Sequence, residues 1–407
     1  MTGRRGLLLW AAAFMLLQCT GGMAMKGKSK GDGWIEFQGF EVSHIRPGRL
    51  PHHLHLNWGK DFGWARYDAE RGELELKTAR FGYADGSWDV FNGIPAEVAT
   101  LDYKTFLIYQ GRGISLYRNP DSRKPDMLML DPRNNYGEDW MAVDPAFRKA
   151  LVPLTGPTRM FEVPEMGGTP LILVKVDIEK GTYTTHPMDH YADSYLGPDF
   201  ILFRHYAPTD VKGQAAKTSH FTATDFDLNE KDLPLVRLLN RDKDSLPDFR
   251  RRFHISSQGW ALMGVHSLTR KPAIYLLSPE GQGSIHPLFE GGTIPIPNQS
   301  LSRCAISDDG RYFVMLTGHD QEEFPSAKGD VVHLGRVEKV EGGFAARIVR
   351  IGDFPDLWVG SPIWIPGTHS LVMNSDPFHH ESRLLLYDVD KHPIDWEKVP
   401  FANPKWQ

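Results

Sequence analysis

Short runs of apolar and β-branched residues alternate with glycine-containing turns through the second half of the chain. Three segments repeat one arrangement, in which an apolar run, a turn and a second apolar run end in a polar loop: residues 253–267, 304–320 and 361–380. Ile255, Ile306 and Ile363 take matching places in this alignment. Such short runs, rich in β-branched and aromatic residues, are typical of strands. A repeat of this length built from strands predicts the blades of a β-propeller.

The first half of the chain continues the pattern less regularly. We predict an all-β fold, a single propeller of seven blades, or of six if the third merges with a neighbour. The first four blades are expected near residues 40–83, 94–133, 159–187 and 199–240, with a helical insertion at 134–150 before the third. Residues 33–42 are expected to add the outer strand of the last blade, because such closure joins the two ends of the chain and removes exposed sheet edges.

The N-terminus has the pattern of an export signal. Two arginines precede an apolar run at residues 6–17, and small residues suitable for cleavage follow before Met25. The run is too short for an ordinary membrane-spanning helix. We therefore predict a signal peptide at 1–24 and an exported, periplasmic or extracellular protein with no transmembrane span in the mature chain.

Cys19 supports a second interpretation, in which the signal is of the lipoprotein type and this cysteine carries the lipid. In both interpretations residues 25–33 form a linker and residues 34–407 form the propeller. The chain contains two cysteines. Cys304 lies on a predicted inner strand, where a lone thiol packs as a small hydrophobic group.

Composition narrows the classes of function. The 407 residues are 41% hydrophobic and 24% charged, which is typical of a globular protein with a packed core. The net charge of −5 gives no basic surface for nucleic acid, and we expect no nucleic-acid partner. We expect a monomer.

The turn SDDGRYFVML at 307–316 resembles the S-x-D-G turn of WD-repeat-like and TolB-like propellers, and SRLLLYDVDK at 382–391 resembles their third strand. The resemblance is specific in these two blades and weak in the first half. It implies a propeller and names no specific family. It also implies that ligands bind on the face where the second strand of each blade ends.

A histidine follows or ends the second strand in each of the last four predicted blades. Two or three imidazoles meeting near the central channel would suit Zn²⁺ or Mn²⁺. The ordinary alternative is a set of solvated loop histidines, because the chain has 17 of them. The predicted metal ligands are His266, His319 and His379, and the predicted ligand-binding residues are His190, Asp376 and Trp358.

Two classes of function stay open, and the sequence leaves it uncertain whether the chain is an enzyme. The first is an exported propeller that binds a carbohydrate polymer or an envelope protein. The second is a metal-assisted lyase acting on uronates, on the resemblance in architecture to oligogalacturonate and ulvan lyases, which carry histidines and a cation or arginine on this face. That interpretation assigns catalytic roles to Arg204, His205, Tyr206 and Arg270. A redox enzyme has little support, because no CxxCH motif is present.

Overall fold

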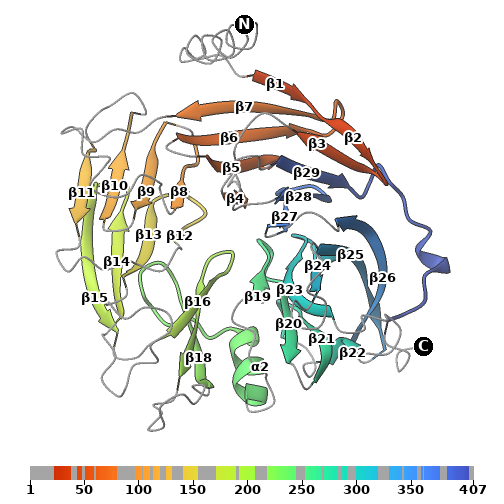
Figure 1. The fold of residues 1–407 in the computed structure, drawn as a ribbon. Helices are drawn as coiled ribbons and strands as arrows, with labels where there is room; N and C mark the ends of the chain where they lie inside the picture. The colour runs from red at the N-terminus through yellow and green to blue at the C-terminus, as the bar shows by residue number, and fades with distance from the viewer. Residues whose placement is uncertain are drawn as a thin grey trace, which may run out of the picture.

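The computed structural model describes residues 23–37, 44–47, 51–58, 61–79, 97–102, 104–110, 113–119, 125–130, 141–154, 171–188, 192–206, 218–243, 253–267, 270–281, 286–290, 299–319, 330–341, 343–354, 359–360, 362–375 and 383–402. These residues form seven antiparallel sheets. The sheets follow one another around a ring, with the first strand, β1 (Met23–Lys26), and the last strand, β29 (Arg383–Asp388), on neighbouring sheets (Figure 1). Among the described residues, no helix is long and apolar enough to cross a membrane.

We number the sheets in ring order. Sheet 1 contains β1 (Met23–Lys26), β4 (His44–Pro47), β5 (His53–Trp58), β6 (Asp61–Asp68) and β7 (Glu73–Ala79). Sheet 2 contains β8 (Glu97–Ala99), β9 (Phe106–Gln110), β10 (Gly113–Tyr117) and β11 (Met127–Leu130). Sheet 3 contains β12 (Ala142–Val143), β13 (Lys149–Leu154), β14 (Leu171–Asp177) and β15 (Thr182–Met188). Sheet 4 contains β16 (Ala192–Leu196), β17 (Ile201–Tyr206) and β18 (Thr218–Thr224), followed by helix α2 (Pro234–Asp242).

The remaining sheets hold the three segments whose repeat the sequence shows. Sheet 5 contains β19 (Phe253–Ile255), β20 (Ala261–Ser267), β21 (Arg270–Leu277) and β22 (His286–Glu290). Sheet 6 contains β23 (Gln299–Ile306), β24 (Tyr312–His319), β25 (Asp330–Val340) and β26 (Gly343–Phe354). Sheet 7 contains β2 (Lys28–Gly31), β3 (Trp34–Phe37), β27 (Ile363–Trp364), β28 (Ser370–Ser375) and β29 (Arg383–Asp388), and the one-turn 3₁₀ helix η3 (Trp396–Lys398) follows.

The N-terminal segment closes the ring as the sequence predicted. Strand β3 pairs antiparallel with β29, so residues from both ends of the chain share sheet 7. The same segment also reaches sheet 1, where β1 pairs with β7. Chain termini that complete a sheet in this way leave fewer unpaired backbone groups at its edge.

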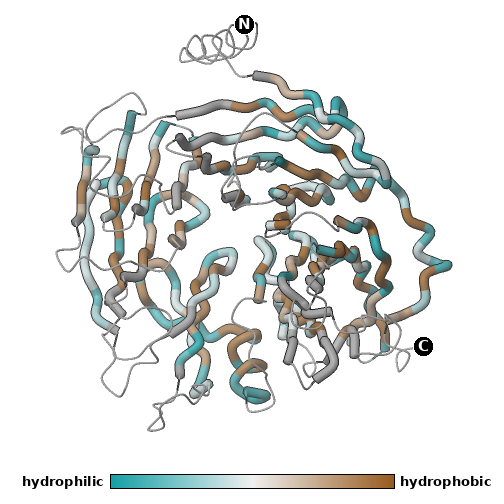
Figure 2. Tube along the Cα trace, in the orientation of Figure 1, coloured by the Kyte–Doolittle hydropathy of each residue, from teal (hydrophilic) through white to brown (hydrophobic). Residues whose placement is uncertain are grey.

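The hydrophobic core lies between the sheets. Separate clusters of buried side chains join sheets 2 and 3, 3 and 4, 4 and 5, 5 and 6, 6 and 7, and 7 and 1. Hydrophobic stretches accordingly lie within many of the strands (Figure 2). Cys304 is buried in the cluster between sheets 5 and 6, as expected for a thiol that packs as a hydrophobic group.

One position of the predicted repeat is wrong. Ile255 and Ile306 each face the preceding sheet. In sheet 7, Trp364 faces the preceding sheet, whereas Ile363 packs on the opposite side against the junction with sheet 1. Because side chains alternate along a strand, an offset of one residue reverses the face. The third repeat is therefore displaced by one residue from the predicted alignment.

The predicted helical insertion at 134–150 is also wrong over its described part, residues 141–150. These residues form β12, a turn and the start of β13, which are the first strands of sheet 3. The Asp144 carboxylate accepts hydrogen bonds from the backbone N–H groups of Arg148 and Lys149, and Phe147 has a φ of 55°. An aspartate that binds its own downstream backbone favours a turn over a helix. The strand expected at 159–168 lies outside the described residues.

Residues 234–240, expected as a strand of the fourth blade, belong to helix α2 instead. Pro234 stands at the helix start, where its missing N–H costs nothing. Leu235, Val236, Leu238 and Leu239 are buried, and their spacing places them on one side of a helix. The helix packs this side against the cluster between sheets 4 and 5.

Candidate functional site

Three predicted histidine positions lie at the same end of the same strand in consecutive sheets. His205 and His266 are the next-to-last residues of β17 and β20, and His319 is the last residue of β24. Each of these strands is the second of its sheet in chain order, so the three positions share one end of the molecule. Pairing is irregular beside two of them, between His205 and Tyr206 and between Val265 and Ser267. Such bulges are frequent next to binding sites because they redirect side chains.

The His205 imidazole is buried and already engaged. Its Nε2 lies 2.8 Å from the Thr222 hydroxyl on the neighbouring strand β18. The ring stacks on that of His220, with 4.3 Å between centroids and 5° between planes. The parallel stack turns the two rings' faces toward each other, so these histidines do not point their nitrogens at a shared metal.

Arg204 lies on the other side of β17. Its Nε donates a hydrogen bond to the Thr218 hydroxyl at 2.8 Å, and the side chain is buried. Leu202 packs between sheets 4 and 5, whereas Phe203 packs between sheets 3 and 4. Alternation along the strand therefore directs Arg204 and His205 into different junctions between sheets.

The other predicted site residues are placed less fully. The structure gives the strand positions of four of them: Tyr206, His266, Arg270 and His319. Arg270 begins β21 and pairs with Ser267. Five residues lie outside the described residues: Cys19, His190, Trp358, Asp376 and His379.

The predicted metal site requires several donor side chains close together. Within the residues that the structure describes, no group of three or more histidine, cysteine, aspartate or glutamate side chains could hold a metal ion. The predicted ligand His379 lies outside the described residues, so the predicted Zn²⁺ or Mn²⁺ site stays a prediction.

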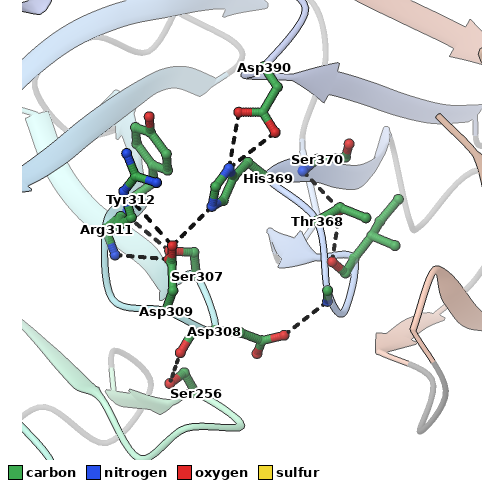
Figure 3. A network of polar contacts seen from close by, with 12 residues as sticks. Ser256, Ser307, Asp308, Asp309, Arg311, Tyr312, Thr368, His369, Ser370 and Asp390 are labelled. Carbon is green, nitrogen blue, oxygen red and sulfur yellow. Dashed lines mark hydrogen bonds and ion pairs between the residues drawn. The ribbon is translucent and has the colours of Figure 1, made fainter. Parts of the chain in front are cut away.

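A polar network that the sequence analysis did not identify lies at the opposite end of the same strands. It is built from the turns between the first and second strands of sheets 5, 6 and 7 (Figure 3). The Asp308 carboxylate accepts hydrogen bonds from the N–H of Ser257 in sheet 5, at 3.3 Å, and of Gly367 in sheet 7, at 3.2 Å. One carboxylate thus bridges three consecutive sheets. The SDDG turn was the signal available in the sequence, where it indicated only the fold.

His369 is the centre of this network. Its Nε2 lies 3.1 Å from Asp309 Oδ2, and its Nδ1 lies 3.0 and 3.1 Å from the two oxygens of Asp390. Burial alone would lower the pKa of His369, but the hydrogen bonds to Asp390 and Asp309 outweigh it and raise that pKa. Burial would raise the pKa of Asp309, yet its bonds from Arg311, Ser307 and His369 lower it.

A cavity of about 360 Å³ adjoins the network between sheets 1 and 7. Its wall includes His52 and Glu70 from sheet 1 and Thr368, Asp388 and Asp390 from sheet 7. His52 has a φ of 65°, and its backbone is held by hydrogen bonds with Pro366 and Tyr67 at 2.8 Å each. A left-handed residue other than glycine costs free energy and persists where its surroundings fix it.

Comparison with known proteins supports the fold. No protein-family model matches the chain, and no curated protein sequence matches it. An oligogalacturonate lyase from Vibrio parahaemolyticus superposes with a TM-score of 0.54 at 11% identity, covering 93% of this chain and 100% of that one. An oligogalacturonate lyase in complex with manganese superposes with a TM-score of 0.51 at 12% identity, covering 90% of this chain and 98% of that one. The chain therefore has an all-β propeller fold, similar to these proteins over nearly its whole length.

Proposed function

We propose that this chain binds an acidic oligosaccharide at the end of the molecule where β17, β20 and β24 end, and cleaves it by β-elimination next to a uronate carboxylate. The observation that carries the proposal is the row of His205, His266 and His319 at one strand end in three consecutive sheets. The two oligogalacturonate lyases of similar fold support uronates as the substrate class.

The proposed chemistry needs a base and a positive charge. A neutral imidazole, that of His205 in this proposal, removes the proton from the carbon beside the carboxylate. A C=C bond then forms, and the glycosidic C–O bond breaks. The leaving oxygen takes a proton, for which Tyr206 is the proposed donor. A guanidinium, Arg270 in this proposal, neutralises the carboxylate and so favours loss of the proton.

A metal ion bound at this end would supply the same neutralising charge. His266, His319 and His379 are the residues proposed to hold it.

Binding without cleavage is the second candidate, and one observation favours it. Arg204 and His205 are buried and hydrogen-bonded to threonines of β18, which suits a structural role better than proton transfer. In this second candidate function, the end of the molecule where β17, β20 and β24 end binds the polysaccharide, and Trp358 is the proposed aromatic contact.

The test is an activity and metal assay on residues 23–407. Purified protein is incubated with oligogalacturonate and other uronate polymers, unsaturated product is followed by its ultraviolet absorbance, and bound metal is measured by elemental analysis. The variant is His266→Ala with His319→Ala. The control is His392→Ala, because His392 follows β29 at the opposite end of the molecule.

The outcomes separate the two candidates. Unsaturated product that the double variant loses and the control keeps supports the lyase proposal. Uronate binding by calorimetry without product supports the binding function. Neither product nor binding with any member of the panel contradicts both.

We also propose that the chain is exported. Strand β1 begins at Met23, so processing at Cys19 would leave β1 whole, whereas cleavage before Met25 would leave Met25 and Lys26 to pair with β7. The mass of the mature N-terminus in fractionated cells, with Cys19→Ser as comparison, separates lipidation, simple cleavage and retention.

A further inference from the structure

The His369 imidazole joins sheets 6 and 7 through two carboxylates. His369 lies in the turn between β27 and β28 of sheet 7, and Asp309 lies in the turn between β23 and β24 of sheet 6. Asp390 follows β29 of sheet 7, so the imidazole bridges a carboxylate of the neighbouring sheet and one of its own. The Tyr312 ring packs edge-on against the imidazole, with 4.9 Å between centroids.

Both ring nitrogens must donate in this arrangement. An ionised carboxylate only accepts hydrogen bonds, and a neutral imidazole has a single N–H. His369 has a carboxylate oxygen within 3.1 Å of each nitrogen, so only the protonated ring satisfies both partners. Hydrogen bonds between a charged donor and a charged acceptor are among the stronger ones in proteins.

The other charged groups around the site do not replace this bond. Arg311 approaches Asp309 at 4.0 Å with its Nε and is more than half exposed. Asp308 directs its carboxylate to the backbone of sheets 5 and 7. Lys391 donates to the Ala69 carbonyl of sheet 1, and Asp388 accepts from the Tyr67 hydroxyl. The ring of His369 is thus the charged donor that connects Asp309 to Asp390.

We propose that His369 is a proton-dependent clamp between sheets 6 and 7, and that loss of its proton as pH rises loosens the junction between these two turns. Deprotonation removes one N–H, so one of the two carboxylates loses its bond from the imidazole while staying charged. Sheet 7 forms one side of this junction, and it is the sheet in which the N-terminal strand β3 closes the ring.

The sign of the pH effect follows from the two shifts. The pKa of His369 is raised in the folded protein, so the clamp contributes fully below the ordinary histidine value and is lost as pH rises through the raised value. The pKa of Asp309 is lowered, so acid removes the clamp only below the usual aspartate range. The clamp therefore holds between the usual aspartate range and the ordinary histidine value, and it opens as pH rises through the raised pKa of His369.

The first measurement is an NMR titration of histidine-labelled protein, residues 23–407, with the His369 signal assigned by its loss in His369→Gln. We expect His369 to stay protonated to higher pH than free histidine. Asp390→Asn, whose parent carboxylate is 66% exposed, should fold and shift the titration to lower pH, and Asp309→Asn should do the same. A His369 that titrates at or below the ordinary value overturns the proposal.

The second measurement links the proton to the junction. The difference in melting temperature between wild type and Asp390→Asn is recorded from pH 6 to pH 9.5, and it should shrink as His369 deprotonates. Asp232→Asn is the control, because Asp232 pairs with Arg237 on the surface outside the junction. Amide protection in the 307–312 and 365–370 turns, corrected for intrinsic exchange, should fall over the same range. A melting difference that is constant with pH, or protection that does not change, overturns the clamp.

Discussion

Histidine residues in this protein have opposite protonation preferences, and the surroundings of each ring explain the difference. His333 is 7% exposed in β25, and burial together with the nearby Arg350 charge lowers its pKa to about 4. Burial also lowers the pKa of His254 to about 4, and its Nδ1 accepts a hydrogen bond from the Ile306 N–H. His369 has its raised pKa because two carboxylates compensate for burial. The same side chain therefore supports neutral packing in two places and a charged clamp in a third.

His333→Gln should reduce the sensitivity of the fold to acid. Between about pH 6.5 and 4 the unfolded chain binds a proton at this histidine that the folded protein does not, so stability falls as pH falls through that window. The cost approaches on the order of 3 kcal/mol at the acid end. Glutamine does not titrate and keeps a polar group near the Thr317 hydroxyl, 3.3 Å from the ring nitrogen.

Urea unfolding at pH 7, 5.5 and 4.5 measures this difference. The exposed Ser29→Ala variant, which removes no titratable group, is the control and should lose as much stability in acid as the wild type. If His333→Gln and the wild type lose the same free energy of unfolding between pH 7 and pH 4.5, the buried ring does not cause the loss of stability in acid.

Among the elements, the N-terminal segment has the most demanding geometry, because it serves two sheets within fifteen residues, 23–37. Strand β1 pairs in sheet 1, and β2 and β3 pair in sheet 7. Gly27 lies at the crossing between β1 and β2. A Cβ atom there would overlap Cγ2 of Ile35 and lie 3.0 Å from the Phe37 ring, which is fully buried.

Gly27→Ala should therefore destabilise the protein, by about 1–3 kcal/mol as for other overpacked sites. Ile35 cannot move its Cγ2 away without changing its rotamer or the backbone of β3. Guanidinium unfolding measures the loss, and the exposed Ser29→Ala in β2 is the matched control. Equal stability of the two variants would mean that the added methyl group fits between β1 and β2 without displacing Ile35.

Elements with strong local patterns were predictable, and those decided by turn chemistry or burial were not. The connecting turn at 69–72 and the strands on both sides of it, β6 and β7, follow the prediction. The apolar residues of 141–151 were compatible with a helix, and the backbone bonds of Asp144 decided for a turn between strands. The sequence predicts a strand at 234–240, whereas the buried leucines of this run have helical spacing.

The histidine row shows the same limit at the site. Sequence alignment located His205, His266 and His319 at one strand end, because strand lengths and turns are visible in the sequence. It did not show that Arg204 and His205 enter different junctions, since side-chain direction depends on register within the sheet. The His369 network was missed because its members come from turns of sheets 5, 6 and 7, which are far apart in the chain.

At the scale of the whole molecule, ring closure depends on a strand contributed by the N-terminus. Trp34 of β3 is 2% exposed, and its Nε1 donates to the Ile351 carbonyl of sheet 6 at 2.7 Å. Its ring contacts Phe354 edge-on at 5.3 Å and Tyr387 at 5.2 Å. Because Trp34 joins the closing strand β3 to sheet 6 and to the rest of sheet 7, it should contribute more to stability than its place near the chain end suggests.

Trp34→Ala should lower the free energy of unfolding by about 3–5 kcal/mol, the range for removing a large buried aromatic side chain. Removing the whole segment, in a chain of residues 38–407, should cost more, because the edge of β29 and its buried leucines at 384–386 lose their cover. Adding a synthetic peptide of residues 23–37 should restore the melting temperature of the shortened chain, and the same peptide with Trp34→Ala should restore less. The measurement is the melting temperature of residues 23–407, of residues 38–407, and of residues 38–407 with each of the two peptides. If residues 38–407 alone melt at the temperature of residues 23–407, closure by β3 does not stabilise the ring, and the stability must come from the junctions between the other sheets.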